Sequence, residues 1–249
     1  MSFPLDIYIG SYIIPIHAVL EFFAFAVGYQ YFLYRKRNGQ PDPLPRDKEW
    51  WIIVGMAAGA LVLSRLVAAL ENPELFFSNP GILYYVSGQT ITGGLVGGII
   101  GVEIAKKILG IKRKTGDLFV YPLILAMIIG RIGCFLTGVT DGTVGLVCNL
   151  PWCLDQGDGL LRHPTSLYEI GFLILAWLSI KWIEKRNGAK QGDLFSLFIF
   201  GYSVFRFIAE FIKPRHELWI GLSSIQLLMF MVMLYYFVYF ILRYRKTNT

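Results

Sequence analysis

Two arginines stand within apolar stretches of the sequence, each in a setting that suits phosphate binding. Arg131 lies in the motif GRIGCF between Gly130 and Gly133, and Arg206 lies in RFIAEF, four residues before Glu210. A guanidinium offers five donors in a planar fork, which matches a phosphate in a low-dielectric site. The two glycines allow a ligand or another helix to approach the backbone closely. An internal ion pair between Arg206 and Glu210 is the structural alternative, because residues four apart share a helix face.

Two histidines also lie beside groups that could take part in proton transfer. His17 and Glu21 are four residues apart in the first apolar stretch, where they form either a base with its orienting acid or a structural hydrogen-bonded pair. The motif HPTSLYE places His163, Tyr168 and Glu169 at the start of a later helix. We expect Glu169 in the first turn of that helix, where the helix dipole alone would favour it. Structural and functional roles are both open for the residues of this motif.

A glycine-rich stretch, SGQTITGGLVGGIIG, predicts a closely packed helix face. Gly93, Gly97 and Gly101 have small-xxx-small spacing, which lets two helix backbones come together. Packing does not explain Gln89, whose amide needs a partner within the membrane. Further on, Asp141 precedes a glycine and predicts a turn just beyond a span.

The three cysteines lead to separate expectations. Cys148 and Cys153 lie five residues apart in a long connection, where they either close a small ring or remain free thiols beside Trp152. Cys134 lies at the membrane end of an apolar segment, which favours a small buried hydrophobe over a nucleophile. No Cys/His spacing resembles a zinc site, so we expect no metal.

Apolar segments of membrane-spanning length position all of these residues. The chain is 249 residues long, with 55% hydrophobic and 16% charged residues. Runs of about 20 apolar residues match the thickness of a bilayer core. The sequence therefore predicts an all-α integral membrane helical bundle, with a single transmembrane domain over residues 1–249. Seven transmembrane helices are expected, at about 11–34, 50–70, 82–105, 117–138, 166–183, 194–212 and 222–242.

The basic residues predict the orientation of the bundle. Seventeen Lys and Arg residues fall in the first, third and fifth connections and the C-terminal tail, against three in the connections on the other side. This split predicts an N-terminus outside and a cytoplasmic C-terminus. It also explains the net charge of +6 without a nucleic-acid partner. The long connection at about 139–165 is then outward-facing, and the polar residues gather in the outer half of the membrane, which suits an anionic lipid headgroup.

In combination, the motifs GRIGxF, HPTSLYE and RFxxxEF resemble the prolipoprotein diacylglyceryl transferases. The motifs GGLxG and GLS fit as well, and the resemblance covers nearly the whole chain in the same order. It implies an enzyme of the bacterial cytoplasmic membrane, with its active site toward the outer leaflet. Such an enzyme moves the diacylglyceryl group of phosphatidylglycerol to the lipobox cysteine of a preprolipoprotein, releases glycerol 1-phosphate and uses no cofactor. Arg131 and Arg206 would hold the phosphate and stabilise developing charge.

The chain departs from this family at the positions that would handle the acceptor. Thr92 stands where the family usually has a histidine, and Cys134 stands where it has an asparagine. His17 occupies the place of a tyrosine in the first span, and Asp141 is a candidate for the missing acid role. We therefore hypothesise that His17 replaces the lost base from another helix. The acceptor is either the prolipoprotein thiol or another thiol or hydroxyl.

A non-catalytic phospholipid-binding or lipid-translocating protein on the same scaffold is the alternative function. The absence of sequence repeats argues against a transporter. The expected site has two sets of residues. The catalytic candidates are Arg131, Arg206, His17 and His163, and the substrate-binding candidates are Gly130, Gly133, Gln89, Thr92, Asp141, Tyr168, Glu169 and Glu210.

Overall fold

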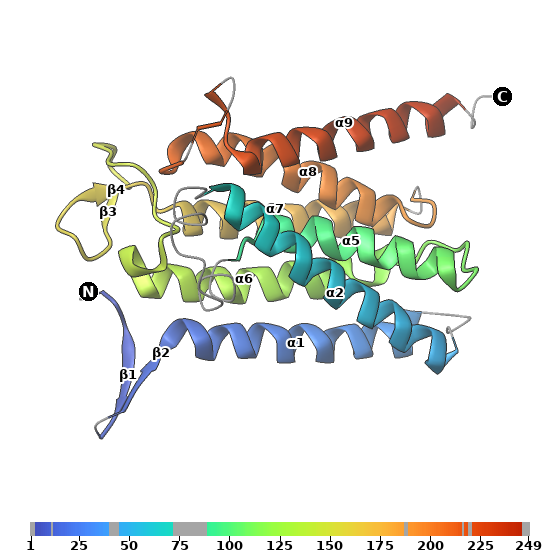
Figure 1. Ribbon diagram of the computed structural model, residues 1–249, viewed down its shortest axis with the longest axis horizontal. Coiled ribbons are helices and arrows are strands. Elements are labelled where there is room, and N and C mark those ends of the chain that lie inside the picture. Colours follow the sequence, from blue (N-terminus) through green and yellow to red (C-terminus); the bar gives the residue numbers. More distant parts are fainter. Residues whose placement is uncertain are drawn as a thin grey trace. The chain divides into compact units, whose positions relative to one another are not determined.

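The computed structural model is helical apart from two short hairpins (Figure 1). It describes residues 3–10, 12–39, 45–71, 89–186, 189–215, 217–218 and 221–245. The helices are α1 (Ile16–Gly39), α2 (Arg46–Glu71), α5 (Ile91–Ile108), α6 (Val120–Thr137), α7 (Thr165–Lys185), α8 (Asp193–Ala209) and α9 (Ser224–Arg245). The hairpins pair β1 (Asp6–Ile9) with β2 (Tyr12–Pro15), and β3 (Leu154–Asp155) with β4 (Leu161–Arg162), both antiparallel. Three short 3₁₀ turns are η1 (Gly116–Leu118), η2 (Gly138–Asp141) and η3 (Glu210–Ile212).

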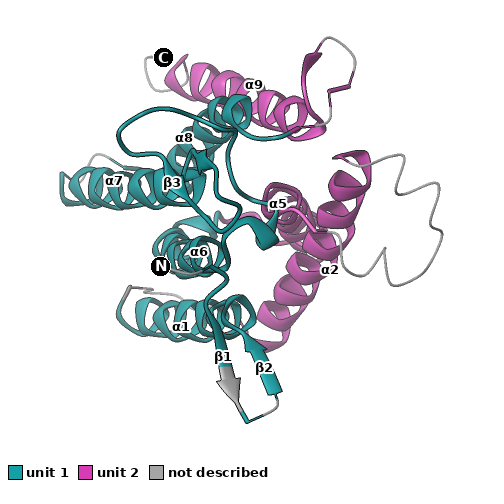
Figure 2. Cartoon of the chain, turned by 90° about the vertical axis from the view of Figure 1, so that its left-hand side faces the viewer, with its two compact units in different colours: residues 1–40, 114–214 teal, residues 41–113, 215–249 magenta. Residues whose placement is uncertain are grey.

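The chain folds as two compact units (Figure 2). Unit 1 comprises Met1–Gln40 and Lys114–Pro214, and unit 2 comprises Pro41–Arg113 and Arg215–Thr249. Unit 1 therefore holds α1, α6, α7 and α8, whereas unit 2 holds α2, α5 and α9.

In unit 1, α6 contacts α1, α7 and α8, and α7 also contacts α8. The core between these helices contains the fully buried side chains of Ile124 on α6, Leu173 on α7, and Phe198 and Tyr202 on α8. Many other apolar side chains of the same helices are exposed, as expected for helices that face lipid. The central position of α6 brings α1, α7 and α8 within reach of the polar side chains near its C-terminal end.

In unit 2, glycines bring α2 and α5 into backbone contact. A Cβ at Gly59 would overlap the carbonyl oxygen of Gly97, and a Cβ at Gly101 would overlap that of Gly55. The predicted glycine face of α5 is thus its packing face. In a membrane no hydrophobic effect drives helices together, so van der Waals packing between closely spaced backbones stabilises their association.

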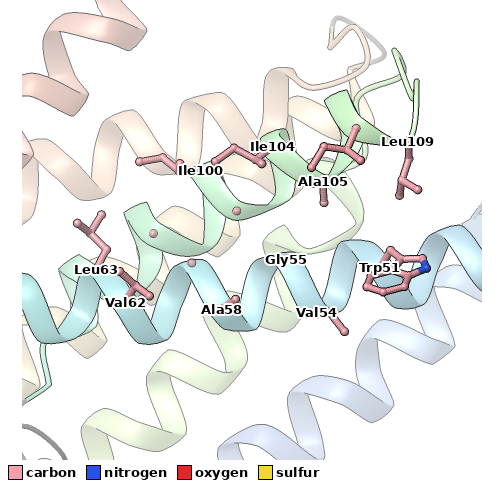
Figure 3. Close-up of a pocket in the computed structure, with 14 residues that line it drawn as sticks. Trp51, Val54, Gly55, Ala58, Val62, Leu63, Ile100, Ile104, Ala105 and Leu109 are labelled. Carbon is pink, nitrogen blue, oxygen red and sulfur yellow. The ribbon is translucent and has the colours of Figure 1, made fainter.

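An apolar groove runs beside this contact on α2 and α5 (Figure 3). It has a volume of about 520 Å³ and is lined by residues that include Trp51, Val54, Val62, Ile100 and Ile104. The described residues that line it include no acid, base or nucleophile. Its apolar lining suits contact with hydrocarbon chains.

Six described helices are long and apolar enough to cross a membrane: α1, α2, α6, α7, α8 and α9. The chain is therefore a multi-pass membrane helical bundle. The expected third span, 82–105, lies partly outside the described residues, and α5 begins only at Ile91, after its N-cap Thr90. The first span begins at Ile16 rather than residue 11, because residues 12–15 pair in the N-terminal hairpin. Seven spans and their orientation remain predictions.

Candidate active site

A buried ion pair joins α6 to α7 in unit 1. The Nε atom of Arg131 lies 2.9 Å from Oε2 of Glu169, with the two side chains only 4% and 2% exposed. The Tyr202 hydroxyl of α8 donates to Oε1 of the same carboxylate at 2.9 Å. Buried charges are costly without partners. The contacts of Glu169 on α7 with Arg131 and Tyr202 therefore connect α6, α7 and α8. Glu169 lies in the second turn of α7, not in the first as expected, and its partner is an arginine rather than the helix terminus.

Arg206 and Glu210 form the internal ion pair that their spacing allows. Nη2 of Arg206 lies 3.0 Å from Oε2 of Glu210, and the side chains are 8% and 3% exposed. Among the described residues, nothing accepts a hydrogen bond from Nε or Nη1 of Arg206. Buried donors without acceptors are costly, and native proteins rarely leave them so. Two nitrogens of this buried guanidinium are thus left without an acceptor in the described part of the chain.

Lys213, one of the three basic residues predicted to lie in outward connections, is the third buried cation of this site. It follows η3 directly and interacts electrostatically with Arg206, Arg131, Glu169 and Glu210. Burial, reinforced by the two arginines, lowers the pKa of Lys213 to about 7. Because α8 ends at Ala209 and the 3₁₀ turn η3 lies between, helical spacing from Arg206 gave no signal for this residue.

His17, Cys134 and Asp141 meet at one end of α1 and α6. Nδ1 of His17 lies 3.0 Å from Oδ1 of Asp141, and its Nε2 lies 3.9 Å from Sγ of Cys134. Nη1 of Arg131 donates to the same sulfur at 3.6 Å. Among the described residues no hydrogen bond or ion pair joins His17 to Glu21, and the His17 ring binds Asp141 instead of the partner expected from the spacing.

The two motif glycines beside Arg131 have different surroundings. A Cβ at Gly133 would lie 3.2 Å from the His17 ring, so this glycine makes room for α1. A Cβ at Gly130 would meet nothing within 4 Å in the described part of the chain. Only Gly130 therefore leaves open space next to the arginine.

The connection after α6 is a tied structure rather than an open loop. Cys148 and Cys153 form a disulfide, with their Cα atoms 6.2 Å apart. Nδ1 of His163 lies 3.1 Å from the Tyr168 hydroxyl, and the His163 ring lies beside the two cysteines. His163 and Tyr168 thus bind each other, and within the described part of the chain neither forms a hydrogen bond or ion pair with Arg131.

The start of α7 is tied to the connection that follows α6. The N-cap of α7 is Pro164, which makes no side-chain hydrogen bond. The Thr165 hydroxyl instead donates to the carbonyl oxygen of Thr143 at 2.6 Å. The Thr143 hydroxyl in turn donates to Asp141. This chain of contacts connects the start of α7 to the carboxylate beside His17.

Two expected site residues lie in unit 2. Gln89 is exposed and precedes α5, whereas Thr92 is buried in the first turn of that helix. Within the described residues, the Thr92 hydroxyl has no hydrogen-bond partner. All the other expected site residues lie in unit 1.

Comparison with known proteins gives a consistent result. The family model described as prolipoprotein diacylglyceryl transferase matches residues 4–242. A phosphatidylglycerol–prolipoprotein diacylglyceryl transferase of Bordetella parapertussis is 30% identical over 220 residues, which is 84% of this chain and 82% of that protein. Proteins of the same name from Campylobacter jejuni subsp. jejuni (30% identity, 80% and 77% coverage) and Chromobacterium violaceum (27%, 84% and 83%) are similar as well. This chain is a membrane-embedded transferase that belongs to the prolipoprotein diacylglyceryl transferase family.

Proposed function

We propose that this transferase moves the diacylglyceryl group of phosphatidylglycerol to a thiol acceptor, with a prolipoprotein cysteine as the expected acceptor. The supporting observation is Arg206, a buried guanidinium with two nitrogens that have no acceptor among the described residues. A phosphate oxygen supplies such acceptors in the geometry that a guanidinium prefers. The substrates named for the bacterial relatives agree with this assignment.

The charges around Arg206 support a bound monoanion. Three cationic groups, Arg131, Arg206 and Lys213, interact with two carboxylates, Glu169 and Glu210. With Lys213 protonated, this cluster carries one net positive charge. The phosphodiester of phosphatidylglycerol carries one negative charge and would neutralise it.

The reaction would exchange one bond at the glyceryl carbon. The acceptor sulfur forms a C–S bond to the diacylglyceryl carbon while the C–O bond to phosphate breaks. The thiol proton is released, and glycerol 1-phosphate leaves with the bonding electrons. A second negative charge develops on the phosphate as the C–O bond breaks. Hydrogen-bond donors and cations that already point at the phosphate stabilise this charge in the transition state.

The acceptor side of the reaction is assigned to the cluster of His17, Cys134 and Asp141. This cluster lies next to Arg131, whose Nη1 contacts the Cys134 sulfur. The imidazole of His17 and the carboxylate of Asp141, 3.0 Å apart, form a pair that can take up and release a proton. Other members of the family usually have their histidine at the position of Thr92.

We further propose that the enzyme lies in the bacterial cytoplasmic membrane as one transmembrane domain with seven spans. The asymmetry of Lys and Arg supports an outside N-terminus and a reaction site toward the outer leaflet. Reporter fusions at the C-terminus and in the 139–165 connection test this orientation. A cytoplasmic signal from that connection would contradict it.

The deciding experiment measures glycerol phosphate released from phosphatidylglycerol by the purified protein with a lipobox peptide. R206Q is expected to lower the rate by about 10²–10³-fold, because it removes charge stabilisation at the phosphate. R162Q is the matched control, since Arg162 pairs with Asp158 at an exposed site. A protein that binds phosphatidylglycerol without releasing glycerol phosphate would be the non-catalytic alternative and would refute the proposal.

A further inference from the structure

The sulfur of Cys134 lies between two ionisable groups, although the reaction described above gives it no step of its own. Nε2 of His17 lies 3.9 Å from Sγ, and Nη1 of Arg131 donates to the same atom at 3.6 Å. The side chain is buried, as its position in the sequence predicted. A small buried hydrophobe would have apolar neighbours, whereas this sulfur lies between a base and a cation.

The two nitrogens of the His17 ring have different neighbours. Nδ1 lies 3.0 Å from Oδ1 of Asp141, whereas Nε2 faces Cys134. When the Nδ1 hydrogen is donated to Asp141, Nε2 keeps the lone pair that can accept the thiol proton. The Thr143 hydroxyl also donates to Asp141 and helps to hold the carboxylate in place. The order of contacts is therefore thiol, imidazole and carboxylate, which is how a nucleophile, its base and the group that orients the base are arranged.

We propose that Cys134, His17 and Asp141 form a nucleophilic triad that cleaves a fatty-acyl ester of a bound glycerophospholipid. The three residues come from the last turn of α6, the first turn of α1 and the η2 turn. Catalytic contacts are often longer than a hydrogen bond until substrate binds, and the distance of 3.9 Å between sulfur and nitrogen belongs to this kind. The triad shares with the proposed function only the binding of a glycerophospholipid beside Arg131, and it acts on a different bond of the lipid.

Open space lies next to the thiol on α6. Gly130 is one turn before Cys134, and a Cβ there would meet nothing within 4 Å in the described part of the chain. Helix side chains lean toward the N-terminus, so the Cys134 side chain lies over the turn that contains Gly130. The His17 side chain is 36% exposed, so the base is not enclosed either. An acyl carbonyl can therefore approach the sulfur from the side of Gly130.

The surroundings of the triad identify the class of ester. Its residues belong to segments of membrane-spanning length, where lipid acyl esters are the available electrophiles. In a glycerophospholipid, the acyl esters and the phosphate are attached to one glycerol unit. Arg131 contacts Cys134 on one side and Glu169 of the proposed phosphate site on the other. A lipid whose phosphate is bound at that site would therefore hold its ester groups in the region of Cys134.

The ester is cleaved in two steps. The Cys134 sulfur attacks the acyl carbonyl carbon while Nε2 of His17 accepts the thiol proton. The C–O bond to glycerol then breaks, and the leaving oxygen takes this proton from His17, which gives a thioester and a lysophospholipid. In the second step, His17 accepts a proton from water as the water oxygen attacks the thioester carbon.

The C–S bond of the thioester then breaks, the sulfur takes the proton back from His17, and a free fatty acid leaves. The sum is one ester and one water giving one alcohol and one acid, so the reaction needs no cofactor. Negative charge develops on the carbonyl oxygen in both steps. Nη1 of Arg131 lies beside the sulfur and stabilises this charge.

The test uses the full-length protein in detergent without reducing agents, with phosphatidylglycerol that carries a labelled fatty acid. Released fatty acid and lysophosphatidylglycerol are measured, and intact-protein mass spectrometry detects an acyl chain bound to the protein. Hydroxylamine at neutral pH cleaves thioesters, so it should remove this chain. Cys134 is the free cysteine, since the other two of the three form the disulfide. The thioester can therefore be assigned to Cys134.

Variants identify the role of each residue. C134A should abolish both fatty acid release and the bound acyl chain. H17A and D141N should lower the rate of release by about 10²–10⁴-fold, the range for loss of a general base or its orienting group. E21Q is the matched control and should keep the wild-type rate, because among the described residues no hydrogen bond or ion pair joins Glu21 to His17. In the wild type, N-ethylmaleimide should inhibit release in proportion to the labelled fraction of Cys134, a measurement that does not depend on the folding of any variant.

Two results would overturn the triad: a folded wild type that neither releases fatty acid nor carries an acyl chain, or release by C134A at the wild-type rate. Glycerol phosphate and fatty acid come from different bonds of the same lipid, so one assay separates the two proposals. Glycerol phosphate release without fatty acid release would retain the transferase proposal and refute the triad. Fatty acid release without glycerol phosphate release would refute the transferase proposal and retain the triad.

Discussion

Arg131 and Glu169 form an ion pair at 2.9 Å in the interior of unit 1, where both side chains are almost fully buried. Glu184, further along the same helix α7, has the same kinds of partner in a more exposed setting. Arg35 lies 2.9 Å from its Oε1, and the Tyr121 hydroxyl donates to its Oε2 at 2.7 Å. Glu184 is therefore a suitable control position for substitutions of Glu169.

E169Q should destabilise the protein far more than E184Q. Removing one charge of a buried pair leaves the other uncompensated, which costs about 3–5 kcal/mol, whereas an exposed pair contributes about 0–1 kcal/mol. Thermal unfolding in detergent, followed by tryptophan fluorescence, measures the difference. Equal losses of stability in the two variants would show that the burial of Glu169 does not matter.

H17A and D141N should each lower the rate of glycerol phosphate release with a thiol acceptor by about 10²-fold or more, the range for loss of a proton-handling group. E21Q is the control. Glu21 shares the helix with His17, but no contact of the described residues joins the two. The assay is the same peptide-dependent release. Wild-type activity in H17A would contradict the assignment of the acceptor side.

Lys213 should make phosphate binding depend on pH. Burial and the neighbouring arginines lower its pKa to about 7, so the side chain is charged below that pH and neutral above it. Affinity for the phosphatidylglycerol headgroup should therefore fall as the pH rises from 6 to 8. K213R should remove this dependence, because arginine stays charged throughout. Binding of a soluble headgroup analogue at several pH values measures the effect, and identical profiles for wild type and K213R would exclude it.

The lowered pKa of Lys213 should also make the free energy of unfolding depend on pH. The unfolded chain binds the Lys213 proton up to about pH 10.4, whereas the folded protein releases it near pH 7. Stability contributed by this group should therefore increase as the pH rises from 7 towards 10, and stay constant below 7. Unfolding of wild type and K213M across this range tests the sign, and a wild-type curve parallel to that of K213M would contradict it.

Glycine substitutions in α5 should have opposite outcomes one turn apart. A Cβ at Gly97 would overlap the carbonyl oxygen of Gly59, so G97A should separate α2 from α5 and destabilise the protein. A Cβ at Gly94 would meet only Ser64 Cβ, at an ordinary 3.8 Å. G94A should be neutral or gain up to about 1 kcal/mol from helix propensity. Thermal unfolding of both variants measures this, and a tolerated G97A would refute the close helix contact.

The disulfide between Cys148 and Cys153 should stabilise the connection after α6. Closing a ring of this size removes unfolded-state entropy worth about 2 kcal/mol. The C148S/C153S variant should therefore be cut more readily in this connection by an added protease, while the helices remain resistant. Unchanged cleavage would show that the hairpin contacts alone hold the connection.

The sequence by itself predicted the membrane class, the approximate positions of six spans and the motif arginines. Apolar runs of bilayer length leave a chain few alternatives to helices, because every backbone polar group must be satisfied within the segment. The glycine spacing in α5 likewise predicts a packing face through local geometry alone. The spacing of Arg206 and Glu210 offered their ion pair as one of two alternatives, and the structure contains this pair at the end of α8.

Only the tertiary structure decided which residues from different helices meet. Glu169 binds Arg131 across two helices, and His17 binds Asp141 rather than its own neighbour Glu21. Lys213 became a buried cation only once η3 turned it toward the arginines. Sequence spacing describes neighbours along one helix, whereas these contacts depend on how helices pack. For that reason no spacing along the chain predicted that His17, Cys134 and Asp141 meet, whereas the folded chain brings them together.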